Sequence, residues 1–237
     1  MTGPVTTQTV REPDPKAAAA RNPVPLFVIG TLVVISAVIA ALVIFSSGDG
    51  SAPKPAAVAP VRAGQASLSV GPGNAPSKVV VYEDFAGPRS REFEIASRDF
   101  LRIEAARGSV RVEYQPFAPG TGYSSDALQA WGGVLSAGTP KQALAFHDVL
   151  FDRQPSSGSP TPSELVSWAQ DKGIDEQRVH AAMAQPDDAL AATADQAAHT
   201  AGASSAPLVT LDGKALSAAS PTALADALQR RILATDQ

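Results

Sequence analysis

The chain contains no cysteine among its 237 residues. A thiolate is the side chain that attacks and re-forms disulfide bonds, so composition alone excludes thiol–disulfide exchange by this polypeptide. A fold stapled by disulfides is excluded for the same reason. An oxidising compartment is not excluded, because a chain without thiols can reside there.

Histidine and strong charge are also scarce. The three histidines, His147, His180 and His199, lie in separate segments with no spacing typical of metal ligands. The net charge of −4 gives no reason to expect nucleic acid as a partner. No phosphate-binding loop, dinucleotide-binding motif or basic patch occurs. The sequence therefore predicts no metal site, no cofactor and no nucleic-acid partner.

One long hydrophobic run lies near the N-terminus. Residues 26–45 are uncharged and mostly apolar, which suffices for a transmembrane helix of about 20 residues. Arg11, Lys16 and Arg21 precede the run, so the positive-inside bias places the N-terminus in the cytoplasm. A cleaved signal peptide is the alternative, although its apolar region usually spans about 7–15 residues.

This run divides the chain into four parts. Residues 1–25, rich in Thr, Pro and Ala, are expected to form a disordered cytoplasmic tail. Residues 26–45 are the predicted membrane helix, and 46–65 form a Pro/Ala-rich linker. Residues 66–237 are long enough for a hydrophobic core and are predicted to fold outside the cytoplasm. The expected location is the cell membrane, with a single pass through the lipid bilayer.

The predicted domain begins with a strand that runs into a helix. Lys78 to Phe85 includes a continuous apolar run, typical of a strand buried on both faces. Gly87 interrupts it, and Pro88 suits the first position of a helix that Gly108 ends. A second strand is predicted over 110–116. The stripe expected to face the core comprises Phe93, Ala96, Phe100 and Ile103.

Helices dominate the middle of the domain. They are predicted over 126–137, 141–151, 161–172, 175–184 and 187–201, and Thr161 to Glu164 forms a capping box. Two strands follow over 207–211 and 214–216, joined by the hairpin turn Asp212-Gly213. A last helix begins near Pro221. The order predicts an α/β fold in which a helical block interrupts a sheet.

Three short segments follow one another in an informative order. They are Tyr82-Glu83-Asp84-Phe85 with Pro88 and Phe93-Glu94, then Phe146 to Phe151, then Ser205 to Val209 with Asp212-Gly213-Lys214. In this order they resemble the DsbA-like thioredoxin-fold family, in its membrane-anchored bacterial branch. The resemblance covers 66–237 and implies a thioredoxin-like sheet with an inserted helical block.

The departures from this family fall where its chemistry resides. Its members are protein disulfide oxidoreductases that use a Cys-x-x-Cys pair. Here Gly87 and Ser90 stand at the two cysteine positions, around Pro88 and Arg89. Val81 stands where many relatives carry a buried acid for proton transfer. The resemblance therefore implies a degenerate active site without catalytic residues, and the chain is predicted not to be an enzyme.

The resemblance also implies a surface that needs no thiol. Pro207 is expected to be cis and to present a backbone edge to an extended peptide, which strand addition would hold. The expected groove is lined by Phe85, Gly87, Pro88, Arg89, Ala206 and Pro207.

These observations predict a membrane-anchored extracytoplasmic protein that binds polypeptides without redox activity. Two alternatives stay open. In the first, Ser90 serves a thiol-conjugate transferase or hydrolase, which requires a base within hydrogen-bond reach. In the second, the domain is a structural module of an envelope complex, which predicts a large exposed apolar patch away from the groove. The oligomeric state is left open.

Overall fold

The computed structural model describes residues 57–58, 66–185 and 187–235. The predicted tail, the predicted membrane helix over 26–45 and most of the predicted linker lie outside this range. Within it, no helix combines the length and the apolar character that crossing a membrane requires. The membrane span therefore stays a prediction from the sequence.

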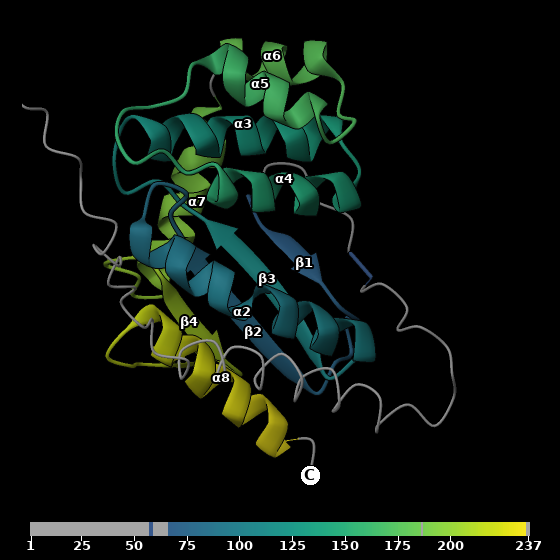
Figure 1. Cartoon of the computed structure of the whole chain (residues 1–237), viewed down its shortest axis with the longest axis vertical. Helices are drawn as coiled ribbons and strands as arrows, with labels where there is room; N and C mark the ends of the chain where they lie inside the picture. Colours follow the sequence, from purple (N-terminus) through teal and green to yellow (C-terminus); the bar gives the residue numbers. More distant parts are fainter. Residues whose placement is uncertain (1–56, 59–65, 186, 236–237) are drawn as a thin grey trace, which may run out of the picture. The chain divides into compact units, whose positions relative to one another are not determined.

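A five-stranded mixed sheet forms the centre of the domain (Figure 1). Its strand order is β1-β3-β2-β4-β5, and β2 and β3 run parallel while the other neighbours are antiparallel. The short strand β1 was not predicted. The strands are β1 (Leu68–Val70), β2 (Ser77–Glu83), β3 (Val110–Pro116), β4 (Leu208–Leu211) and β5 (Lys214–Ala215).

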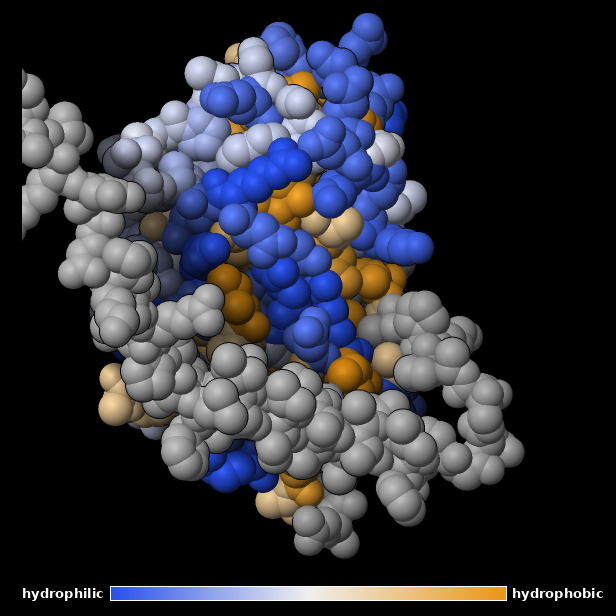
Figure 2. Space-filling view, in the orientation of Figure 1, coloured by the Kyte–Doolittle hydropathy of each residue, from blue (hydrophilic) through white to orange (hydrophobic). Residues whose placement is uncertain are grey.

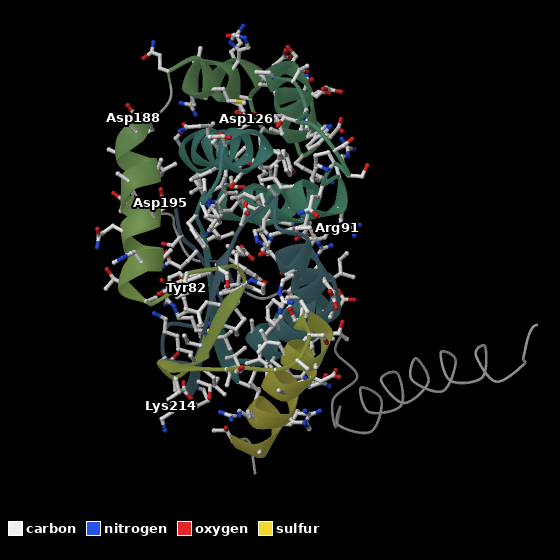
Figure 3. The ribbon with its side chains drawn as sticks, turned by 90° about the vertical axis from the view of Figure 1, so that its left-hand side faces the viewer. Tyr82, Arg91, Asp126, Asp188, Asp195 and Lys214 are labelled. Carbon is white, nitrogen blue, oxygen red and sulfur yellow. The ribbon has the colours of Figure 1, made fainter. Side chains whose placement is uncertain are left out.

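The two faces of the sheet are covered differently. Helices α2 (Pro88–Arg107) and α8 (Pro221–Thr235) pack together on one face, and α7 (Asp188–Thr200) lies on the other (Figure 3). In β2, Val79 and Val81 are fully buried, whereas Val80 and Tyr82 are only half-buried. The prediction of a strand buried on both faces is therefore wrong, since α7 covers only part of its face.

The helical block stands beyond one end of the sheet (Figure 1). It comprises α3 (Tyr123–Ala137), α4 (Pro140–Asp152), α5 (Pro162–Gln170) and α6 (Glu176–Ala184). Thr139 and Thr161 open α4 and α5 with capping boxes, as the sequence indicates for Thr161. Trp131 is fully buried at the centre of the block. The predicted inserted helical block is thus confirmed.

The buried face of α2 differs from the predicted stripe. Phe93 is buried, but Ala96 is exposed and Phe100 and Ile103 are half-buried. The face includes the carboxylates Glu94 and Glu104, which pair with Arg98 and Arg107 of the same helix and which a hydrophobic period does not identify. Its members are Ser90, Phe93, Glu94, Ser97, Leu101, Glu104 and Ala105.

Two predicted details near the C-terminal strands are confirmed. Asp212 and Gly213 both have positive φ, 50° and 77°, as a two-residue hairpin turn of the primed type requires. The bond between Ala206 and Pro207 is cis.

Candidate functional site

The degenerate turn lies where β2 passes into α2. Pro88 and Arg89 are exposed and Gly87 is half-buried, so this part of the turn is open to solvent. Pro88 occupies the first turn of α2, where its missing N–H leaves no hydrogen bond unmade. The positions that carry cysteines in the family thus keep the geometry of a strand-to-helix junction.

Side chains from the helical block hold the backbone of this turn. The Gln154 amide, just beyond α4, donates to the carbonyl of Phe85 at 2.6 Å and to that of Gly87 at 3.2 Å. The hydroxyl of Ser124 in α3 donates to Asp84 Oδ1 at 2.7 Å. The Gly87 N–H donates to the Asp84 carbonyl at 2.9 Å. These contacts fix the turn without any disulfide.

Ser90 is buried beneath the turn, with 1% of its surface exposed. Its Oγ accepts a hydrogen bond from the Asp84 N–H at 3.2 Å. Among the described residues, no basic side chain hydrogen-bonds to this hydroxyl. A nucleophile needs both access and a base, so the geometry gives no support to catalysis by Ser90.

Phe85 lies in the core rather than on the surface. Its ring is fully buried and packs against Trp131 and Phe151, with centroid distances of 6.0 and 5.1 Å. The side chain of Phe85 therefore does not line a groove, contrary to the expectation, because the helical block covers it. Ala206 and Pro207 are half-buried.

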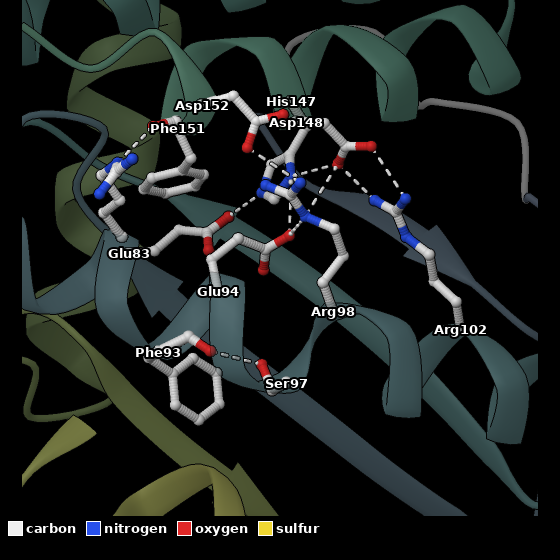
Figure 4. Close-up of polar contacts among 11 residues, drawn as sticks. Glu83, Phe93, Glu94, Ser97, Arg98, Arg102, His147, Asp148, Phe151 and Asp152 are labelled. Carbon is white, nitrogen blue, oxygen red and sulfur yellow. Dashed lines mark hydrogen bonds and ion pairs between the residues drawn. The ribbon is translucent and has the colours of Figure 1, made fainter. Parts of the chain in front are cut away.

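A cluster of buried charges lies directly under Phe85. His147 of α4 is fully buried, and its Nε2 lies 2.6 Å from Glu83 Oε1 of β2 (Figure 4). Its Nδ1 lies 3.7 Å from both Glu94 Oε1 of α2 and Asp148 Oδ1. The rings of Phe85, Trp131, Phe151 and Tyr114 surround the imidazole. His147 therefore joins the sheet, α2 and the helical block.

Arginines of α2 complete the cluster. Arg98 Nε lies 3.0 Å from Glu94 Oε1, and its Nη1 lies 3.0 Å from Asp152 Oδ1. Arg102 grips the Asp148 carboxylate with both of its terminal nitrogens, an arrangement that favours strong ion pairing. Three buried or half-buried carboxylates, Glu83, Glu94 and Asp148, thus face the three basic side chains His147, Arg98 and Arg102.

Burial and neighbouring charge set the protonation of this cluster. Burial by itself lowers the pKa of His147, but Glu83 and Glu94 outweigh it and raise that pKa to about 10. Burial opposes ionisation of Asp148 as well, yet His147 and Arg102 hold the pKa of its carboxyl well below the usual range. His147 is therefore an imidazolium at neutral pH. Burial raises the pKa of its partner Glu83, and the neighbouring charges of His147 and Arg98 oppose that shift.

Glu83, Glu94 and His147 also have the chemistry of metal ligands. One potential ligand atom of each lies within 4.8 Å of the others, and Oε2 of both glutamates has no hydrogen-bond partner among the described residues. A divalent ion would have to displace the proton between His147 and Glu83, and Glu94 already has a cationic partner in Arg98 at 3.0 Å. We therefore assign the cluster as an ion-pair network rather than a metal centre.

The spacing of residues in the sequence does not reveal this cluster. Glu104 of α2 is a further buried carboxylate and pairs with Arg107. Val81 is apolar and buried as expected, but β2 still carries a buried acidic residue. Glu83, one strand period further along the same face, carries a buried carboxylate.

Comparison with known proteins agrees with this architecture. Residues 64–230 match the family model described as Thioredoxin. BdbD from Bacillus subtilis aligns with a TM-score of 0.59 at 21% identity, over 74% of this chain and 96% of that one. The disulfide bond oxidoreductase DsbG from Mycobacterium tuberculosis aligns with a TM-score of 0.57 at 23% identity, over 70% and 86%. No curated protein matches the chain significantly.

A third neighbour has the same layout. DsbA from Mycobacterium tuberculosis aligns with a TM-score of 0.56 at 21% identity, over 75% of this chain and 92% of that one. Identities at this level establish the fold and leave activity to the residues of the site. The chain therefore belongs to the thioredoxin family, with the DsbA-like arrangement of sheet and helical block, and carries glycine and serine in place of the paired cysteines.

Proposed function

We propose that this protein is a membrane-anchored, extracytoplasmic binding protein that recognises polypeptides beside the degenerate turn and does not exchange disulfides. The supporting observation is that the backbone of the turn is held by hydrogen bonds although glycine and serine stand at the two cysteine positions. Gln154, Ser124 and Asp84 hold its backbone, and Pro88 and Arg89 stay open to solvent. A surface of this kind can bind an extended segment through main-chain hydrogen bonds, which require no thiol.

The binding surface that we propose comprises Gly87, Pro88, Arg89, Ala206 and Pro207, with Phe85 contributing only as support from below. Over the described residues, Ile95 of α2 is the one large apolar side chain that is exposed. On the face in Figure 2, apolar atoms outside the grey region occupy small separate areas among hydrophilic ones. This distribution gives no support to the alternative of a structural module that docks through a large apolar patch.

A screen of cysteine-free extended peptides against the purified full chain tests peptide binding. Ala206→Arg places bulk and charge on the proposed surface and should abolish the binding of the selected peptides. Ala181→Arg makes the same change at an exposed position of α6 and should leave binding unchanged. Peptides that bind both variants equally well would count against this surface.

The membrane anchor is proposed from residues 26–45 and from the basic residues before them. Because the chain has no cysteine, single cysteines can report its topology without background labelling. In intact cells, an impermeant maleimide should label Ser217→Cys, at an exposed position after β5, and should not label Thr7→Cys. Labelling of both positions, or of Thr7→Cys alone, would contradict the proposed orientation.

A further inference from the structure

The two edges of the sheet differ in how they are protected against pairing with another chain. The β5 edge is a strand of two exposed residues that includes Lys214 and follows a tight turn. Short strands and lysine are devices that discourage edge-to-edge association. The β1 edge has no charge: it reads Leu68-Ser69-Val70, and its two apolar side chains are 1% exposed.

A short segment of the predicted linker lies against β1 (Figure 1). Val58 forms an antiparallel bridge with Val70, and the Gly71 N–H donates to the Ala57 carbonyl at 2.6 Å. Val58 is half-buried and packs against both hydrophobic clusters of the domain. Its side chain therefore covers apolar surface that the β1 edge would otherwise expose.

Gly71 follows β1 directly and has a backbone conformation that favours glycine. Its φ is +99°, and a Cβ at this position would lie 2.4 Å from the Val110 carbonyl, so a side chain does not fit. β1 pairs with β3 on its inner side, which leaves its outer backbone groups for the linker segment. The outer edge of β1 is therefore open to pairing with a segment from outside the sheet.

We propose that Ala57 and Val58 act as an edge guard, a segment bridged to β1 that prevents β1 from pairing with β1 of a second copy of this chain. Two identical edges can associate antiparallel about a two-fold axis, because the same surface is self-complementary in that arrangement. The contacts described for the guard are one backbone hydrogen bond, one bridge and one half-buried valine. A single substitution at Val58 should therefore release it.

The absence of cysteine provides a direct test in the full chain. Ser69→Cys places a reporter on β1, and Lys214→Cys places a control at the opposite edge. Each is combined with Val58→Asp, which puts a charge on the apolar contact, and with Val58→Ile, which keeps that contact. The readouts are hydrogen exchange of the Gly71 amide and formation of disulfide-linked dimers under mild oxidation.

Val58→Asp should raise the exchange rate of the Gly71 amide by roughly fivefold, the effect of losing a typical hydrogen bond. It should also yield dimers linked through Ser69→Cys, whereas Val58→Ile should do neither and Lys214→Cys should give no dimer in any background. Val58→Thr, closer in shape, should act in the same direction and serves if the aspartate variant does not fold.

Unchanged exchange at Gly71 in the released variants would overturn the guard contact. Faster exchange without dimers would overturn its role against self-association. Dimers formed equally through Lys214→Cys would show that the copies meet without using the β1 edge, which also contradicts the proposal.

Discussion

His147 is the residue at which the sheet, α2 and the helical block meet. Replacing it with leucine leaves Glu83 buried without its cation, and an uncompensated buried charge costs about 3–5 kcal/mol. We expect His147→Leu to lower the free energy of unfolding in urea by that amount. His199→Leu, at an exposed position of α7, should stay within about 0.5 kcal/mol of the unchanged protein. Equal effects of the two changes would contradict the assigned ion-pair network.

The protonation of His147 gives a second prediction for a single residue. Glu83 and Glu94 raise its pKa to about 10, above the ordinary value of about 6.5. The stabilisation that it contributes is therefore complete below about pH 6.5 and is lost as the pH rises through about 10. Imidazole ¹⁵N shifts of the folded protein should show His147 still protonated at pH 8. A neutral His147 at pH 8 would contradict this assignment.

The sequence predicted buried hydrophobic residues in part, and it did not predict the buried charged ones. Phe93 was expected on the core-facing stripe and is buried. The contact of Glu94 with His147 was not foreseen, because His147 lies 53 residues further along the chain on another helix. Local spacing carries no signal for such a contact, and only the tertiary structure brings the charges together.

At the scale of elements, Gln154 connects the end of α4 to the degenerate turn. Gln154→Leu removes the donor to the Phe85 and Gly87 carbonyls and should cost about 1–3 kcal/mol, since the Phe85 carbonyl loses its partner while the Gly87 carbonyl keeps the Arg91 N–H. Hydrogen exchange should speed up locally over residues 84–88. Gln170→Leu, at an exposed position of α5, should change neither stability nor exchange in the turn. No change over 84–88 in Gln154→Leu would show that the turn holds its own shape.

The same turn should accept a disulfide. A Cβ added at Gly87 would lie 3.2 Å from Ser90 Oγ, so side chains at these two positions approach each other closely. The Cβ atoms of a disulfide lie about 3.8 Å apart, which also requires a close approach. The φ of Gly87, −75°, suits any residue. We therefore expect Gly87→Cys combined with Ser90→Cys to form an intramolecular disulfide on oxidation, measured by mass and thiol titration. Each single variant serves as control, and failure of the pair to close would show that the turn has lost the geometry of its relatives.

Elements with local signals were predicted well. The capping box at Thr161, the proline that opens α2 and the turn at Asp212-Gly213 all mark boundaries that the structure has. β1 was missed because its three residues are too few to show the alternation of apolar and polar side chains that marks a strand. It exists only through its pairing with β3. The guard segment at Ala57 and Val58 was missed for the same reason.

At the scale of the whole molecule, the fold of an oxidoreductase family is retained while its reactive atoms are absent. Purified full chain should give only background in insulin reduction and in dithiol oxidation, because no sulfur nucleophile exists to attack a disulfide. The double cysteine variant provides the matched control in both assays. Turnover by the unchanged chain above a buffer blank would overturn the proposal that this protein does not exchange disulfides.

Hydrogen exchange of the full chain, measured with and without a saturating unfolded, cysteine-free polypeptide, tests the central claim most directly. Binding beside the degenerate turn should protect the amides of residues 84–89 and 204–208 and leave the exposed surface of α6 unchanged. Ala206→Arg should abolish that protection. Protection confined to other surfaces, or none at any concentration of polypeptide, would contradict a protein that works by contact at this site.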